Sequence, residues 1–163
     1  MKSTRLATLC AALGLFSVLS VSSRADIYND ATNDLFDNGF SNLDITSVEV
    51  TNNATTITFK VTTRAFQNWT KYLIWIDTPG RTNAPANNNG WGRPANLAGG
   101  EGADFFIGSW VDATTNNIQL WNWNGTLWAG PASYTTVNSG NTVSYTIPLS
   151  TLGLSAGNGI KLS

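Results

Sequence analysis

The sequence predicts an all-β protein, an antiparallel β-sandwich of jelly-roll or immunoglobulin-like kind with eight or more short strands. Three observations predict it. Apolar residues recur with a period of two, short clusters of turn-forming residues separate the apolar segments, and no window shows the sustained period of an amphipathic helix. The strands and turns expected from these patterns account for most of the chain.

The first two strands are expected over residues 43–50 and 55–63. In the second, apolar residues alternate strictly with threonine and lysine, which indicates a strand with one buried face. In the first, the alternation slips between Ile45 and Val48. We therefore expect a β-bulge near Thr46.

Residues 71–77 and 104–111 are apolar on both faces, which predicts central strands. Residues typical of turns separate the strands that follow. These are expected over residues 117–123, 126–129, 133–137 and 142–148. The last five residues, 159–163, begin another strand. A sandwich rarely finishes this way, so we expect a fragment that lacks its last strand and any C-terminal sorting tail.

The first 25 residues are expected to be a signal peptide. Lys2 and Arg5 precede an apolar run over residues 6–21, and small residues at Ser23 and Ala25 suit a cleavage site. The apolar run contains serines and falls short of the ~20 residues that span a bilayer. We therefore expect residues 1–25 to be removed and residues 26–163 to form one binding domain, exported to the cell surface, the medium or the periplasm, without membrane insertion.

The composition of the mature chain excludes several classes of chemistry. The single cysteine and the single methionine, Cys10 and Met1, lie in the leader, and the sequence has no histidine. Thiol and histidine-assisted nucleophiles, the usual zinc sites and haem ligation therefore lack their residues. Six basic residues remain against ten acids, a net charge of 6 − 10 = −4, which disfavours nucleic acid as a partner.

Three tryptophans flank an Asn-Gly pair near the middle of the chain. A two-residue turn at that pair would place Trp121 opposite Trp128 and Trp123 opposite Thr126, with all three indoles on one face of a hairpin. Flat apolar rings beside amide groups suit the C–H faces and hydroxyl edges of a sugar. The alternative is that these indoles fill the sandwich core.

A long loop is expected over residues 78–102, rich in glycine, proline and asparagine, with Trp91 between two glycines. Loops of this length in a compact domain are usually functional or disordered. The Trp91 indole either plugs the loop onto the sheet or meets a ligand. The ligand-binding residues predicted from the loop and the hairpin are Trp91, Arg93, Trp121, Asn122, Trp123 and Trp128.

Acidic residues are a second candidate set, because calcium takes oxygen ligands. The predicted ligands are Asp30, Asp34, Asp44, Asp77 and Asp104, which the strand ends would have to bring together. A structural calcium would stabilise a domain that has no disulfide. The alternative is that these aspartates cap turns. Glycoside hydrolysis is not expected, since Glu49 lies in the middle of a strand and Glu101 in a glycine-rich loop without an evident partner.

Five segments resemble DOMON-like sandwich domains, which are similar to family 9 carbohydrate-binding modules and to the C-terminal domains of glucodextranases. The segments are Asp-Ala-Thr-Asn-Asp at 30–34, Leu-Asp-Ile-Thr-Ser-Val-Glu-Val at 43–50, Trp-Ile-Asp-Thr at 75–78, Gly-Ala-Asp-Phe-Phe-Ile at 102–107 and Leu-Trp-Asn-Trp-Asn-Gly-Thr-Leu-Trp at 120–128. The resemblance covers nearly the whole mature chain and implies a secreted β-sandwich that binds a sugar. Two features depart from the pattern: Asp77 precedes Thr-Pro-Gly instead of further acids, and the axial residues of haem-binding relatives are missing.

The sequence therefore predicts a secreted, non-catalytic carbohydrate-binding module whose partner is a polysaccharide or glycan. Two alternatives stay open. One is a cell-surface or matrix structural protein with its anchor in the missing C-terminus, and the other is an accessory domain of a larger glycoside hydrolase. A structural calcium is the one cofactor expected, with no zinc and no haem.

Overall fold

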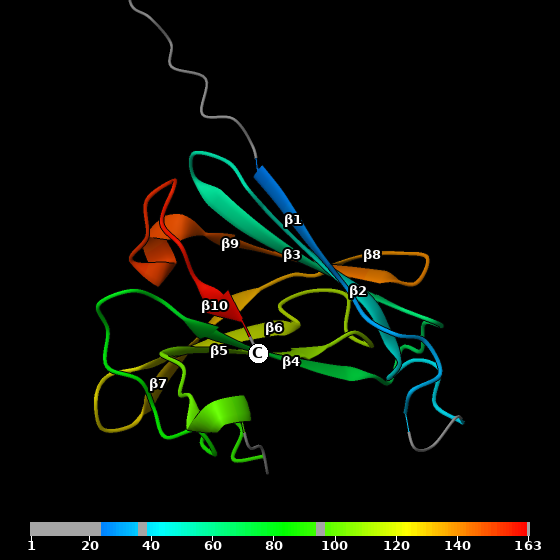
Figure 1. The fold of residues 1–163 in the computed structure, drawn as a ribbon, viewed down its shortest axis with the longest axis horizontal. Helices are drawn as coiled ribbons and strands as arrows, with labels where there is room; N and C mark the ends of the chain where they lie inside the picture. Colours follow the sequence, from blue (N-terminus) through cyan, green and yellow to red (C-terminus); the bar gives the residue numbers. More distant parts are fainter. Residues whose placement is uncertain (1–23, 36–38, 94–96, 163) are drawn as a thin grey trace, which may run out of the picture.

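Two five-stranded antiparallel sheets pack face to face in the computed structural model, which describes residues 24–35, 39–93 and 97–162 (Figure 1). Sheet A has the strand order β1-β2-β3-β9-β8 and contains β1 (Arg24–Asn29), β2 (Ile45–Asn52), β3 (Thr56–Thr63), β8 (Val137–Ser139) and β9 (Thr142–Pro148). Sheet B has the order β10-β4-β5-β6-β7 and contains β4 (Lys71–Asp77), β5 (Phe105–Trp110), β6 (Ile118–Trp123), β7 (Trp128–Tyr134) and β10 (Lys161–Leu162). The predicted all-β antiparallel sandwich is confirmed.

Helical structure in the described residues is limited to two short 3-10 turns, η1 (Ala98–Gly100) and η2 (Leu149–Leu152). No helix in this part of the chain has the length and apolarity needed to cross a membrane. The predicted signal peptide lies outside the described residues except for its last two positions, Arg24 and Ala25, which are the first residues of β1.

Strict alternation in β3 produces the two different faces of sheet A. Ile57, Phe59 and Val61 are buried against sheet B, and the threonines and the lysine between them lie on the outer face. On that outer face, Thr58 and Thr62 of β3 each share a 2.9 Å hydrogen bond with a threonine of β9. The outer face of sheet A is therefore a polar ladder.

The predicted β-bulge lies where the sequence places it. The β2–β3 register shifts between Ile45 and Ser47, which leaves Thr46 without a partner residue on β3. The Thr46 hydroxyl instead donates to the carbonyl oxygen of Thr62, at 3.1 Å. The bulge restores the alternation, so that Val48 lies opposite Val61 on the inner face.

The core lies between the sheets and is built from aliphatic and aromatic side chains of both. Its fully buried members include Phe59, Ile76, Ile107, Ile118 and Ile147. Tyr145 of sheet A is also buried, and its hydroxyl lies 2.9 Å from the hydroxyl oxygen of Ser109 in sheet B. Burial raises the pKa of Tyr145 well above its ordinary value, which keeps this inter-sheet hydrogen bond neutral.

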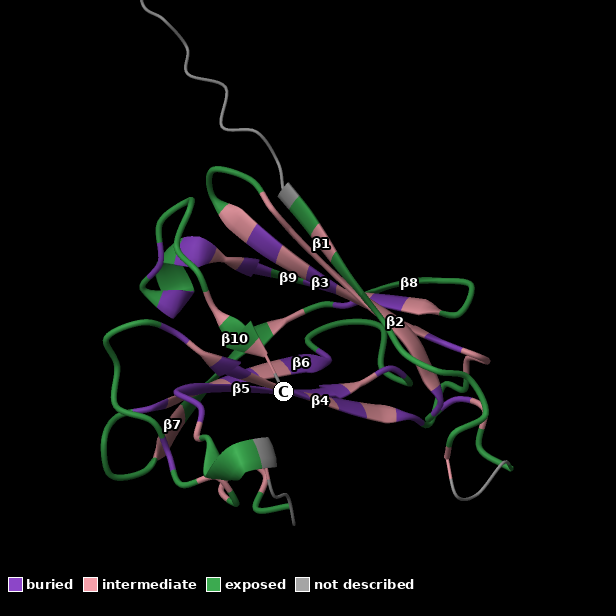
Figure 2. Cartoon of the chain, viewed as in Figure 1, coloured by how far each residue is buried: buried purple, intermediate pink, exposed green. Residues whose placement is uncertain are grey.

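Three strand predictions were wrong or incomplete. β1 and β8 were not predicted, because both are edge strands whose residues are mostly exposed, and β8 has only three residues (Figure 2). The strands expected over residues 126–129 and 133–137 are one strand, β7, with a register irregularity opposite Trp121. Gly130 and Pro131 occupy that irregularity at the edge of the sheet, where a proline removes no hydrogen bond from a central ladder.

Candidate functional site

A second apolar layer covers the outer face of sheet B, away from the sandwich core. Its centre is Phe106, which is fully buried and pairs with Trp75 of β4 on one side and Trp121 of β6 on the other. The Trp75 and Phe106 ring centroids are 5.3 Å apart. We call this the outer aromatic layer; its members are Trp75, Trp91, Phe106, Trp110, Trp121, Trp123 and Trp128.

The described parts of the loop between β4 and β5, residues 78–93 and 97–102, lie on the side of sheet B that faces away from sheet A (Figure 1), and the loop packs on this layer around Gly90 and Trp91. Trp91 lies over Gly108 of β5: a Cβ atom at Gly108 would be 2.4 Å from the Trp91 indole. The Trp91 ring packs on Trp110 in a tilted arrangement, with centroids 4.5 Å apart, and its Nε1 donates to the Gln119 side chain at 2.7 Å. Trp91 therefore packs the loop onto the sheet, and its contact with a ligand stays a prediction.

The loop around Trp91 is held in shape by a buried asparagine. The Asn89 side chain accepts hydrogen bonds from the backbone N–H groups of Trp91 and Arg93, both at 3.1 Å, and donates to the Arg93 carbonyl oxygen at 2.7 Å. Gly90 then lies directly on the Trp121 indole, because a Cβ there would be 2.4 Å from that ring. The Arg93 side chain itself is exposed.

The tryptophan hairpin has a different register from the predicted one. Trp123, not Trp121, lies opposite Trp128, and their rings make an edge contact with centroids 5.6 Å apart. The connecting loop has four residues, because the Asn124 side chain accepts from the backbone N–H groups of both Thr126 and Leu127, each at 3.0 Å. This side-chain turn replaces the two-residue turn that the Asn-Gly pair suggested.

The predicted ligand-binding residues therefore do not form one site. Trp91, Trp121, Trp123 and Trp128 belong to the outer aromatic layer. Asn122 lies between two of them in the strand and so points to the other face of β6. There it lines a separate 420 Å³ pocket, together with Arg81 and Pro131 among others.

The outer aromatic layer is partly buried. Trp123 is only 8% exposed, and the indole N–H groups of Trp75, Trp121 and Trp128 are buried with no hydrogen-bond partner. Buried polar hydrogens without partners are uncommon, and each costs stability. Geometrically, the layer lies between sheet B and the loop. Phe106 and Trp123 are buried in it, and the members that keep part of their surface accessible are Trp75, Trp91, Trp110, Trp121 and Trp128.

The predicted calcium ligands are also not brought together. Asp44 is buried, 3.0 Å from Arg64 Nε, and Asp104 is buried, 2.8 Å from Arg81 Nε. The two lie at opposite ends of β4: Asn42, two residues before Asp44, bonds to Thr70 just before β4 begins, while Asp104 donates its N–H to Ile76 near the end of that strand.

The other three acids add no ligands around either buried carboxylate. Asp30 and Asp34 are exposed, and Asp77 is a backbone register partner of Lys161 where β4 meets β10. Within the described ranges, no group of three or more Asp, Glu, His or Cys residues could hold a metal ion. Calcium binding stays a prediction: a melting temperature that rises with added calcium and falls with EDTA would support it, and an unchanged one would reject it.

One exposed aromatic pair was missed by sequence reasoning. Trp69 is 50% exposed and Phe40 44% exposed, and their rings make an edge-to-face contact with centroids 6.3 Å apart and an interplanar angle of 86°. We call this pair the end platform. The sequence pattern that drew attention to Trp91, a tryptophan in a polar connection between two strands, is also present at Trp69, which follows Gln67 and Asn68.

Hydrogen bonds hold both segments of the end platform in place. The Asn42 side chain donates to the Thr70 hydroxyl at 2.7 Å, and the Tyr72 hydroxyl donates to the Asn42 carbonyl oxygen at 3.2 Å. Both Asn42 and Thr70 are buried; Asn42 comes two residues after Phe40 in the sequence, and Thr70 comes directly after Trp69. The two rings are therefore fixed relative to each other by a buried polar contact and not by the rings alone.

No protein-family model, curated protein sequence or solved structure matches this chain. What the protein binds therefore has to be inferred from its own surfaces.

Proposed function

We propose that this chain is a secreted, non-catalytic carbohydrate-binding module of the DOMON-like sandwich kind. The observation that carries the proposal is the end platform, an exposed Phe40–Trp69 pair on a fixed support. Aromatic rings offer flat apolar surfaces for the C–H face of a sugar ring, while their neighbours supply hydrogen bonds to its hydroxyls. Gln67 and Asn68, both exposed, are amide-bearing neighbours of this kind.

The pair is exposed although the fold has places to bury aromatic residues. Six other tryptophans are packed in or at the margin of the outer aromatic layer, whereas Trp69 presents half of its surface to solvent. An exposed large aromatic side chain on a rigid support is typical of a binding surface. This contrast favours the end platform over Trp91 and Trp128 as the first contact with a sugar.

The placement of the acids supports a binding role without catalysis. Glu49 pairs with Lys60, Glu101 with Lys161, and Asp104 with Arg81. Glycoside hydrolases need two carboxyl groups that face one substrate, one of which acts as an acid. Carboxylates engaged separately by basic side chains do not provide that arrangement.

A glycan array followed by titration of the bound sugars tests the proposal. Trp69→Ala is expected to remove binding and to leave the melting temperature nearly unchanged, because the indole is half exposed. Leu127→Ala is the matched control, since Leu127 is 55% exposed in the hairpin loop, away from the end platform. It is expected to retain binding.

Two results would contradict the proposal in different ways. If the unmutated chain binds no glycan, the carbohydrate function is wrong. If binding survives Trp69→Ala and is lost in Trp128→Ala with the fold intact, the protein binds a sugar, but at the margin of the outer aromatic layer.

A further inference from the structure

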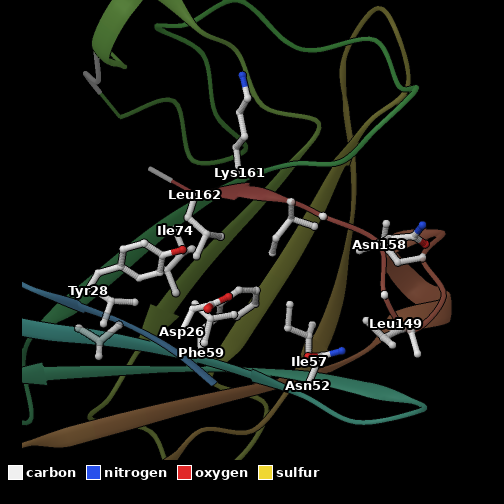
Figure 3. Close-up of a pocket in the computed structure, with 18 of the residues that line it drawn as sticks. Asp26, Tyr28, Asn52, Ile57, Phe59, Ile74, Leu149, Asn158, Lys161 and Leu162 are labelled. Atoms are coloured by element: carbon white, nitrogen blue, oxygen red, sulfur yellow. The ribbon is translucent and has the colours of Figure 1, made fainter. Parts of the chain in front are cut away.

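A pocket of 420 Å³ lies at the β7 margin of sheet B, a volume within the range of small-molecule sites. The larger apolar cleft between β1, β2 and β10, which Figure 3 shows, lies at the opposite margin of sheet B and shares no lining residue with this pocket. The residues that form the walls of the pocket include Arg81, Leu120, Asn122, Pro131, Ala132 and Thr151.

Small residues in β7 leave this space open. Ala132 lies opposite Leu120 and Ala129 lies opposite Asn122, with the register irregularity of β7 between them. Gly130, within that irregularity, has a φ of 123°, a conformation that residues with a side chain rarely adopt. Two methyl groups and a glycine therefore stand where larger side chains would fill the space beside Leu120 and Asn122.

One wall of the pocket is an arginine held in a fixed position. Arg81 Nε lies 2.8 Å from a carboxylate oxygen of Asp104, and Arg81 Nη2 donates to the Trp123 carbonyl oxygen at 3.3 Å. The guanidinium carbon lies 4.8 Å from the centroid of the Phe105 ring. Asp104 is buried and also accepts hydrogen bonds from the backbone N–H and the hydroxyl of Thr78. Three contacts thus fix the guanidinium, and a buried carboxylate balances its charge.

Two polar groups at the pocket have no hydrogen-bond partner among the described residues. One is Nη1 of Arg81, and the other is the side-chain amide of Asn122. Asn122 is partly buried and lies two residues after Leu120, on the face of β6 that otherwise packs into the core. Polar groups in such places normally have a partner, so these two indicate a bound polar molecule. Thr151, whose hydroxyl lies 3.1 Å from that of Tyr134, lines the same pocket.

We propose that this pocket binds one neutral sugar unit, either a free sugar or the terminal residue of a glycan. The Arg81 guanidinium and the Asn122 amide hydrogen-bond to neighbouring hydroxyls, while Leu120 and Pro131 contact C–H groups. A neutral ligand is favoured because Arg81 is the one charged side chain among the described residues of the lining, and Asp104 balances it. The inference rests on the proposed carbohydrate function but not on the end platform.

The pocket and the end platform are separate sites. Trp69 comes just before β4 begins at Lys71, whereas Arg81 follows the end of that strand at Asp77. A strand of seven residues spans roughly 20 Å, at about 3.4 Å per residue. One sugar unit therefore cannot contact both sites, and each can be tested without the other.

A titration of the ¹⁵N-labelled protein with glucose, galactose, mannose and xylose, followed by NMR, tests the proposal. At least one of these sugars is expected to shift the side-chain amide signals of Asn122 and to leave the indole N–H signal of Trp69 unchanged. An oligosaccharide that ends in the bound sugar separates the two sources. If it shifts the same Asn122 signals, the pocket takes the end of a glycan, and if only the monosaccharide does, the pocket takes the free sugar.

Two variants and a matched control test the role of the pocket residues. Asn122→Ala is expected to weaken binding of the sugar at least tenfold without lowering the melting temperature, because the amide has no partner to lose among the described residues. Ala132→Leu should weaken binding as much by filling the pocket. Ser133→Leu is the control, since residue 133 lies on the opposite face of β7. It is expected to bind the sugar as the unmutated protein does.

The proposal is wrong if none of the four sugars shifts the Asn122 signals, or if binding survives both Asn122→Ala and Ala132→Leu. It is also wrong if glucuronic acid binds at least tenfold more tightly than the neutral sugar, since the site would then select an anion. Trp69→Ala should leave binding in the pocket unchanged. If glycans bind through Trp69 and no sugar reaches Asn122, the pocket proposal alone fails, whereas a chain that binds neither sugars nor glycans contradicts the proposed function as well.

Discussion

The outer faces of the two sheets differ in their exposure to solvent. On sheet A, threonine, lysine and glutamate side chains form cross-strand pairs that remain accessible to solvent, such as Lys60 with Glu49. On sheet B, aromatic side chains cover the equivalent face and a long loop covers them. The outer face of sheet A is made compatible with solvent by its own polar side chains, whereas the outer face of sheet B is covered by a separate segment of the chain.

The difference is clearest at the centre of sheet B. β3 and β4 alternate between buried and partly exposed positions, whereas β5 buries side chains on both of its faces. Glycine makes the cover fit: Gly108 and Gly90 leave room for the Trp91 and Trp121 rings, which a Cβ atom would displace. The loop is therefore part of the folded core of the protein and not only a connection.

The strongest test of this comparison truncates one side chain on each outer face. Phe106→Ala is expected to lower the free energy of unfolding by about 3–5 kcal/mol, because Phe106 is fully buried among three tryptophans. Thr146→Ala removes one exposed hydrogen bond to Thr58 and should cost about 0.5 kcal/mol. Denaturant unfolding measures the loss of free energy of unfolding in both variants. Equal losses would show that the loop does not cover a tightly packed apolar layer.

The second prediction concerns Trp91, which packs the loop onto sheet B. Trp91→Ala is expected to cost about 3 kcal/mol, the low end for a tryptophan, because its ring is packed on Trp110 and Phe106 but remains partly exposed. The residues that flank Trp91 should also become accessible to protease. A variant with unchanged unfolding and unchanged cleavage would instead favour Trp91 as a ligand contact that sheet B does not need.

Sequence patterns predicted the fold well because the alternation of apolar and polar residues can be read within a single strand, without knowledge of the rest of the structure. That local signal gave the sandwich, the central position of β4 and β5, and the bulge at Thr46. It failed for the hairpin after β6, where the outcome depends on whether the Asn124 side chain or the Asn-Gly backbone closes the turn. Both turns are formed by the same residues, so the sequence pattern does not distinguish them.

The candidate site was harder to predict, for a different physical reason. A period of two shows that Trp121 and Trp123 share a face, but it does not show what lies above that face. The cover comes from the part of the loop around Gly90 and Trp91, whose position depends on long-range contacts such as Trp91 on Gly108. The sequence therefore suggested exposed indoles where the structure has buried or partly covered ones, and it did not distinguish Trp69, in a polar connection like that of Trp91, as the more exposed of the two.

The third prediction measures the fit between loop and sheet. Gly108→Ala is expected to cost about 1–3 kcal/mol, since its Cβ would push into the Trp91 indole. In a Trp91→Ala background the same change should cost less, because the ring it displaces is gone. A double-mutant cycle measures this coupling; strictly additive effects would mean that the two residues do not meet in solution.

The smallest effect is expected from the polar face of sheet A. Lys60 lies 3.1 Å from Glu49, with side chains 38% and 30% exposed, so water and salt screen most of their attraction. Lys60→Met should therefore change the free energy of unfolding by about 0.5 kcal/mol or less, and 1 M salt should remove most of that difference. Glu49→Gln is the matched change on the partner and should behave in the same way. A loss of about 2 kcal/mol or more in either variant, insensitive to salt, would show that this face is also covered, and the contrast between the two sheets would then not hold.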